Sequence, residues 1–182
     1  MTLARGFKTG CERTVSALRE ELGVDDDEPL DMHVAADHLE IPVRPLAELL
    51  IPAGGHRTDP HVDEIYRKVS AFTVFKGWQR SIVYNDEHAP PRHRSNLAHE
   101  LSHALLQHPP RDHGLPAEQA QRHEAEAAWL SGVMMLTADQ ARRIVTCGMS
   151  RAVAEARFQL STEMLRFRLN VTGAARLAAR TV

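Results

Sequence analysis

The segment His99-Glu100-Leu101-Ser102-His103 carries two histidines four residues apart and a glutamate directly after the first. Residues four apart share one face of an α-helix, so the two imidazoles can bind one Zn²⁺ while the glutamate reaches a water molecule on the metal. This arrangement is typical of zinc-dependent hydrolysis. The alternative is a surface helix on which two histidines occur by chance.

The residues around this motif predict the helix that it needs. An apolar stripe at helical spacing runs through the segment and consists of Leu97, Leu101, Ala104 and Leu105. Pro91 lies near the expected start of the helix and Pro109 lies beyond its expected end. Helices tolerate proline in the first turn and often stop before one, so the two prolines bound this helix.

A second predicted helix, over 117–136, can supply a third metal ligand. It carries Glu124 and Glu126, which lie about 200° apart around an ideal helix, so only one of them can face the histidines. We favour Glu124 as the ligand and interpret Glu126 as a solvated side chain. Small residues near the Glu124 face would let the two helices approach; they are Ala127, Ala128 and Ser131.

The remaining patterns predict a small sheet followed by helices. We expect helices over 11–22, 32–39 and 46–50, an extended piece at 41–43, a loop at 52–55, and a β-hairpin with strands over 69–75 and 81–84. Everything after Pro90 looks helical, with breaks at 109–110, 114–116, 146–150 and Gly173. The fold class is therefore α+β, with a small antiparallel sheet packed on the helix of the histidine motif and a helical C-terminal segment.

Composition excludes several classes of protein. Of the 182 residues, 43% are apolar and 25% are charged, which is far from the composition of disordered chains. No stretch is long and apolar enough for a membrane span or a signal peptide. The cysteines, Cys11 and Cys147, are too few for a disulfide framework, so we expect free thiols and a cytoplasmic location. Cys11 and Cys147 are interpreted as core residues rather than as regulatory zinc ligands.

Charge is divided unevenly along the chain. Residues 12–64 contain 14 acidic and 4 basic residues, and residues 140–182 contain 2 acidic residues and 8 arginines. Such asymmetry can mark a nucleic-acid surface, but we favour the plainer interpretation that the two ends of the chain dock on each other or that the arginines simply solvate helices. The arginines are Arg142, Arg143, Arg151, Arg157, Arg166, Arg168, Arg176 and Arg180.

Three blocks of the chain resemble the ImmA/IrrE family of zinc metallopeptidases. Residues 92–106, around the histidine motif, look like the active-site helix of that family. The segment Glu124-Ala125-Glu126-Ala127-Ala128-Trp129-Leu130 resembles the family pattern E-x-E-A-N-x-F-A, with Met134-Met135-Leu136-Thr137 similar to its L-L-M-P ending. Residues 154–161, with Leu165 and Arg168-Leu169, resemble the closing helices. The resemblance covers roughly residues 69–173.

The resemblance implies a single metallopeptidase domain over 1–182. Its parts would be N-terminal helices and an extended segment at 1–68, the sheet and zinc-binding helices at 69–136, and basic helices at 137–182. One Zn²⁺ would be held by His99, His103 and Glu124, and Glu100 would take a proton from water and pass it to the leaving amine. The strand at 81–84 would pair with an extended substrate.

Family members typically cleave a helix-turn-helix repressor encoded nearby, in response to DNA damage or phage stress. This chain resembles the short forms, such as the CapP-type peptidases of CBASS anti-phage operons, which implies activation by single-stranded DNA bound to the C-terminal arginines. No membrane partner is expected. The alternatives are a DNA-binding regulator, and a zinc scaffold that binds the repressor without cutting it.

Two positions depart from the family pattern. Ala128 stands where the family has an asparagine that could support a zinc-binding histidine, so another group, such as Asp112, must take that role. Thr137 replaces a proline and is expected to change only how the helix ends. The group that stabilises the transition state is not assigned by the sequence; the candidates are Tyr84, His108, His113 and His123.

Overall fold

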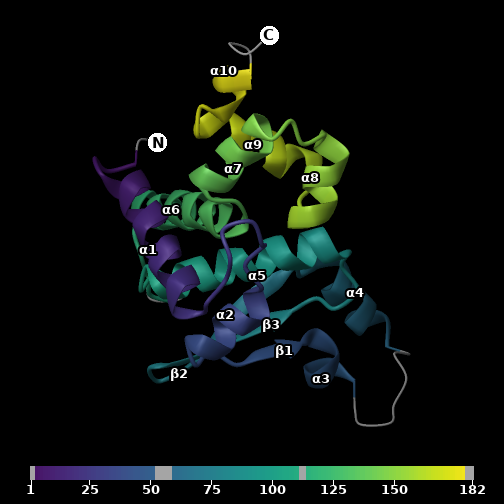
Figure 1. Cartoon of the computed structure of the whole chain (residues 1–182). Helices are drawn as coiled ribbons and strands as arrows, with labels where there is room; N and C mark the ends of the chain where they lie inside the picture. Colours follow the sequence, from purple (N-terminus) through teal and green to yellow (C-terminus); the bar gives the residue numbers. More distant parts are fainter. Residues whose placement is uncertain (1–2, 52–58, 111–113, 179–182) are drawn as a thin grey trace.

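A computed structural model describes residues 3–51, 59–110 and 114–178. A small sheet lies at one end of the molecule and a cluster of helices at the other (Figure 1). In chain order the elements are α1 (Phe7–Glu21), α2 (Met32–His38), β1 (Val43–Pro45), α3 (Leu46–Leu50), α4 (Pro60–Lys68), β2 (Ala71–Lys76), β3 (Gln79–Tyr84), α5 (Pro90–Leu105), α6 (Ala117–Met135), α7 (Ala138–Thr146), α8 (Arg151–Phe158), α9 (Thr162–Val171) and α10 (Ala174–Ala178).

The sheet has three strands in the order β1-β3-β2. The β2–β3 pair is the expected antiparallel hairpin, and Gly77 adopts a φ of 61° in its two-residue turn, as such hairpins require. In addition, β1 pairs with β3 in parallel, so the sheet is mixed. The α+β class is confirmed. Because β3 is paired on both sides, the expectation that residues 81–84 pair with a substrate is wrong; the edge strands of the described sheet are β1 and β2.

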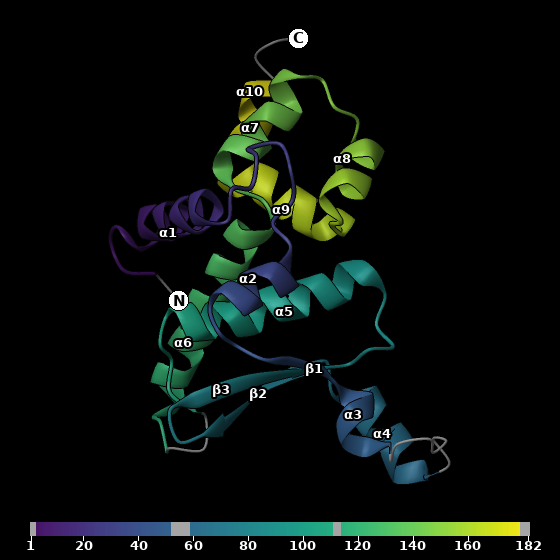
Figure 2. The same ribbon diagram turned by 60° about the horizontal axis from the view of Figure 1, so that its bottom comes forward.

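Helix α5 covers one face of the sheet and α6 packs on α5 (Figure 2). Helix α5 begins with Pro90 and Pro91, and at this first turn the missing amide hydrogens of proline cost nothing. Small buried residues of both helices allow the close approach: Ala98 and Ser102 of α5, and Ala127 and Ser131 of α6. Ala128 is exposed, so it lies outside this interface, in contrast to the expectation.

Arg94 ties α5 to three other segments. Its buried guanidinium donates hydrogen bonds to the carbonyl oxygens of Leu30 (3.2 Å), Met135 (3.3 Å) and Phe158 (3.0 Å). The carbonyls of Met135 and Phe158 lie at the ends of α6 and α8, where helix geometry leaves carbonyls without partners, and Leu30 lies in the segment before α2. Burial lowers the pKa of Arg94 to about 10, and the side chain remains protonated at neutral pH.

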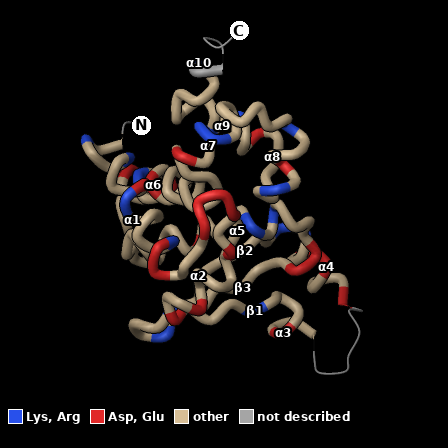
Figure 3. The backbone as a smooth tube through the Cα atoms, viewed as in Figure 1, with Lys and Arg blue, Asp and Glu red and all other residues tan. Residues whose placement is uncertain are grey.

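The basic C-terminal helices dock on acidic residues from the N-terminal third (Figure 3). Arg143 and Arg157 pair with Asp27, in the loop between α1 and α2, at 3.2 and 3.4 Å. Arg168 is fully buried and pairs with Glu12 of α1 at 2.7 Å. For these arginines the structure supports docking of the two ends of the chain.

Some boundaries differ from the sequence-based expectations. Helix α4 was not expected, and the predicted loop at 52–55 lies outside the described residues. The helical C-terminal part is further divided at Gln159, which adopts a left-handed φ of 49°. Thr137 does more than end α6, because it starts α7 with a capping box in which Thr137 and Gln140 bond to each other's backbone.

The two cysteines lie in different environments. Both cysteines are free; Cys11 is buried, but Cys147 is exposed, so the interpretation of Cys147 as a core residue is wrong. Burial raises the pKa of the Cys11 thiol to about 11, which agrees with a core residue and not with a reactive thiolate.

In the described part of the chain, no helix combines the length and apolar character that crossing a bilayer requires.

Candidate metal centre

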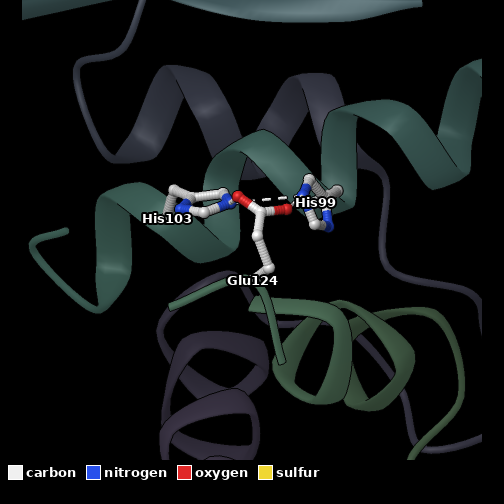
Figure 4. Close-up of side chains that lie close together, drawn as sticks. All are labelled: His99, His103 and Glu124. Carbon is white, nitrogen blue, oxygen red and sulfur yellow. Dashed lines mark hydrogen bonds and ion pairs between the residues drawn. The ribbon is translucent and has the colours of Figure 1, made fainter. Parts of the chain in front are cut away.

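The structure brings together His99, His103 and Glu124, the three residues that the sequence proposed as ligands. Both histidines project from one face of α5, and the Glu124 carboxylate enters between them from α6 (Figure 4). The Glu124 oxygens lie 3.3 Å from His99 Nε2 and 3.4 Å from His103 Nε2. The two Nε2 atoms lie 3.2 Å from each other.

This geometry fits a tetrahedral metal ion. Ligand bonds of about 2.0–2.1 Å place neighbouring donors of a tetrahedron about 3.3 Å apart. The three observed separations, 3.2, 3.3 and 3.4 Å, agree with that value. Two imidazole nitrogens and one carboxylate form the donor set of hydrolytic zinc enzymes, in which a fourth position serves water or substrate. The residues present therefore fit zinc.

Glu100 lies beside this group and is oriented by the sheet. The hydroxyl of Thr73, on β2, donates a hydrogen bond of 2.7 Å to Glu100 Oε2. Thr73 alternates with the exposed residues Phe72 and Val74, so its side chain points from the sheet toward α5. The edge strand thus fixes the carboxylate that the sequence proposed as the general base.

A cavity of about 550 Å³ opens in front of these residues. Its wall includes Glu100, His103 and Glu124 together with Phe72 and Thr73 of the edge strand. Arg80 of β3 also lines the cavity and donates a hydrogen bond of 3.1 Å to the carbonyl oxygen of His103. The cavity therefore joins β2 to Glu100 and to two of the three candidate ligands, His103 and Glu124.

Behind the candidate ligands lies a second group of ionisable side chains. His103 Nδ1, the nitrogen that faces away from Glu124, lies 3.0 Å from His108 Nδ1. His108 Nε2 lies 3.2 Å from Glu126 Oε2, and the His108 ring stacks on His123 with centroids 4.2 Å apart. Burial lowers the pKa of His108, with the nearby His123 as the next cause.

Glu126 is not the solvated residue that the sequence suggested. Its side chain is only 15% exposed and contacts both His108 and Arg122. The ideal-helix argument remains correct in one respect, because Glu126 lies outside the group formed by Glu124 and the two motif histidines. It faces instead His108, which lies three residues beyond the end of α5.

The remaining residues that the sequence suggested for the site do not all line the cavity. Tyr84 packs on His93 with ring centroids 4.2 Å apart and ring planes tilted by 35°, and it is absent from the residues that line the cavity. His123 lines the cavity, whereas His113 and Asp112 lie outside the described residues. Arg80, which sequence reasoning missed, is a cationic side chain in the cavity wall. No periodic or motif signal distinguishes Arg80 or Thr73 from other strand residues.

Comparison with known proteins assigns the chain to a family. The family model of the IrrE N-terminal-like domain, peptidase family M78, matches residues 37–170. The chain therefore belongs to this metallopeptidase family, whose members typically use zinc. Comparison with curated proteins gives no match. The match begins in α2 and includes β1, so it extends further toward the N-terminus than the resemblance carried by the motifs.

Proposed function

We propose that the chain is a zinc-dependent endopeptidase in which His99, His103 and Glu124 hold the metal and Glu100 is the general base. The observation that carries the proposal is the convergence of three donor atoms at mutual distances of 3.2–3.4 Å. A chance pair of surface histidines would have no reason to meet a carboxylate from another helix at that spacing.

Each residue has a defined part in peptide hydrolysis. Bound zinc would supply a Lewis acid that polarises the scissile carbonyl and acidifies water. Glu100, held by Thr73, accepts the proton of the attacking water and returns it to the leaving amine. The edge strand β2 offers its backbone to an extended substrate, which it would hold beside Glu100. Arg80 provides positive charge in the cavity wall.

The proposed substrate is one specific protein, a helix-turn-helix repressor encoded nearby, which is cut after DNA damage or phage stress. The proposal rests on family membership and on the site. Activation by single-stranded DNA is the second part of the proposal, and exposed arginines such as Arg166 and Arg176 would provide the phosphate contacts. Most of the described arginines of the C-terminal helices already pair with acidic side chains, which leaves fewer arginines for DNA than the sequence suggested; the paired ones are Arg142, Arg143, Arg151, Arg157 and Arg168.

Substitution of Glu100 tests the central claim. The Glu100→Gln protein should still bind one zinc but cleave the repressor at least about 100-fold more slowly, because general-base catalysis contributes that much or more. Mass spectrometry of the repressor, incubated with and without single-stranded DNA, measures cleavage and locates the cut. Glu118→Gln, on the exposed first turn of α6, is the matched control.

The same experiment separates the alternatives. A zinc-loaded wild-type protein that binds the repressor and leaves it intact would be a scaffold. A protein that binds DNA and holds no zinc would be a regulator. Cleavage by Glu100→Gln at the wild-type rate would contradict the proposed role of Glu100. Equal cleavage with and without DNA would remove only the activation part of the proposal.

A further inference from the structure

We infer that His108, oriented by Glu126, positions His103 as a metal ligand through a hydrogen bond between the two imidazole rings. The inference rests on the proposed zinc site, to which it adds a supporting chain from α6. It starts from three contacts that lie in sequence: His103 Nδ1 to His108 Nδ1 at 3.0 Å, His108 Nε2 to Glu126 Oε2 at 3.2 Å, and Glu126 Oε1 to Arg122 Nε at 3.5 Å.

Metal binding fixes every proton in this chain. His103 approaches Glu124 and His99 through Nε2, so Nε2 is the atom that would bind zinc, and the ring proton must then reside on Nδ1. His103 Nδ1–H donates to His108 Nδ1, which is the only role left to a nitrogen 3.0 Å away. The proton of His108 then lies on Nε2 and is donated to the Glu126 carboxylate. Each donor meets an acceptor, and the chain ends on a charged group.

The end of α5 brings His108 into this position. Gln107 adopts a left-handed φ of 55°, and the backbone NH groups of Gln107 and His108 donate to the carbonyl oxygens of Ala104 and His103. This pair of bonds is a Schellman motif, which folds the chain back over the last helical turn. The ring of His108 is then fixed by stacking on His123. A side chain held in this way gives up little entropy when it orients a metal ligand.

His108, His123 and Glu126 themselves have donor atoms within 4.8 Å of one another, so they resemble a second metal site. Two observations speak against a metal there. The His108 and His123 rings are almost parallel, at 12°, and lone pairs that lie in parallel ring planes do not converge on one ion. A metal on His108 Nε2 would also move the His108 proton to Nδ1, so two N–H groups would face each other at 3.0 Å.

The inferred chain fills a role that the sequence left vacant. Ala128 has no polar side chain. A zinc-binding histidine almost always donates a hydrogen bond from its second ring N–H to an acceptor. Removal of such a support typically weakens metal binding about 10- to 100-fold. His108 and Glu126 are thus positioning residues, which act on the metal through His103 and need no contact with the substrate.

Zinc affinity, measured by competition with a chromogenic chelator, tests the inference without a peptidase assay. His108→Phe keeps an aromatic ring on His123 but removes both nitrogens; zinc should bind about 10- to 100-fold more weakly, and the visible absorption bands of the Co²⁺-substituted protein should shift. His123→Phe is the matched control, because it alters the same ring stack, and its affinity should stay close to the wild-type value. Glu126→Gln should weaken binding by a smaller factor than His108→Phe.

Three results would overturn the inference: wild-type affinity in His108→Phe, equal losses in His108→Phe and His123→Phe, or a second zinc per chain that either variant loses. If His108→Phe does not fold, Glu126→Gln provides the test. An unchanged zinc affinity in that variant rejects the inferred chain of hydrogen bonds. A wild-type protein that binds no zinc at all would instead reject the proposed function, so the two failures are distinguishable.

Discussion

At the scale of single residues, the candidate base depends on one hydroxyl group from another element. The hydrogen bond from Thr73 to Glu100 joins the edge strand to the helix of the histidine motif at 2.7 Å. A hydrogen bond to a charged group contributes about 1.5–3 kcal/mol, which corresponds to a factor of about 10 to 100 in rate if the bond is needed to hold the base in place. Loss of the Thr73 hydroxyl should therefore lower the rate of cleavage. Its hydrogen bond goes to Glu100 and not to a candidate metal ligand, so metal binding should be unaffected.

We predict that Thr73→Val lowers kcat/KM for the cleaved partner about 10-fold while the zinc content stays at one per chain. The isosteric valine keeps the shape of the side chain and the strand register. Steady-state cleavage rates and elemental analysis measure the two quantities. Thr73→Ser retains the hydroxyl and should remain near the wild-type rate; an unchanged rate in the valine variant would show that Glu100 needs no such support.

At the scale of elements, the junction of α6 and α7 connects the helix that carries Glu124, a candidate metal ligand, to the C-terminal helices. Thr137 caps α7 by accepting a bond from the Gln140 backbone, and the Gln140 side chain in turn accepts one from the Thr137 backbone. The Gln140 amide also donates to the carbonyl oxygens of Asp26 and Glu28 at 3.0 and 2.9 Å. The capping box therefore also positions the Gln140 side chain, which binds the acidic loop at residues 25–28.

Thr137→Ala should lower the free energy of unfolding by about 1 kcal/mol, the usual cost of losing an N-cap side chain. Urea denaturation followed by circular dichroism measures the change. Thr137→Ser keeps the capping oxygen and should lose much less. Equal losses in the two variants would mean that the methyl group of Thr137, and not its hydroxyl, provides the stability.

At the scale of the whole molecule, the sheet, α2 and α5 meet around a histidine that resists protonation. The His93 ring of α5 packs on Tyr84 of β3 and His33 of α2, with centroids 4.2 and 5.3 Å apart. Its pKa is lowered, chiefly by burial and then by the neighbouring His33 and His88. Among the described residues, the buried Nε2 atom of His93 has no hydrogen-bond partner.

We therefore predict a loss of stability in acid. Above the unfolded-state pKa of about 6.5 both states are neutral at this position; below it the unfolded chain gains a proton that the folded chain takes up only at lower pH. The free energy of unfolding should thus fall as the pH decreases from about 6.5 through the lower folded pKa of His93. Urea titrations of metal-free protein at several pH values measure the slope, and His93→Phe should flatten it. An identical slope in that variant would place the acid sensitivity elsewhere.

The sequence by itself determined the features that depend on local geometry. The four-residue spacing of His99 and His103 fixes both side chains on one helix face, and the patterns of α5 and α6 are long enough to predict both helices. That only one of Glu124 and Glu126 can face the histidines also followed from angular position on one helix. These predictions needed no knowledge of how distant segments pack.

Only the tertiary structure decided the features that depend on contacts between distant segments. Thr73 reaches Glu100 because β2 lies under α5, and a single threonine in a strand carries no signal of that. His108 reaches His103 because Gln107 adopts a left-handed conformation that glycine, not glutamine, usually signals. The parallel pairing of β1 and the docking of Arg143 on Asp27 are likewise non-local. Packing selects such contacts from many that the sequence alone permits, so their partners emerge only in the folded chain.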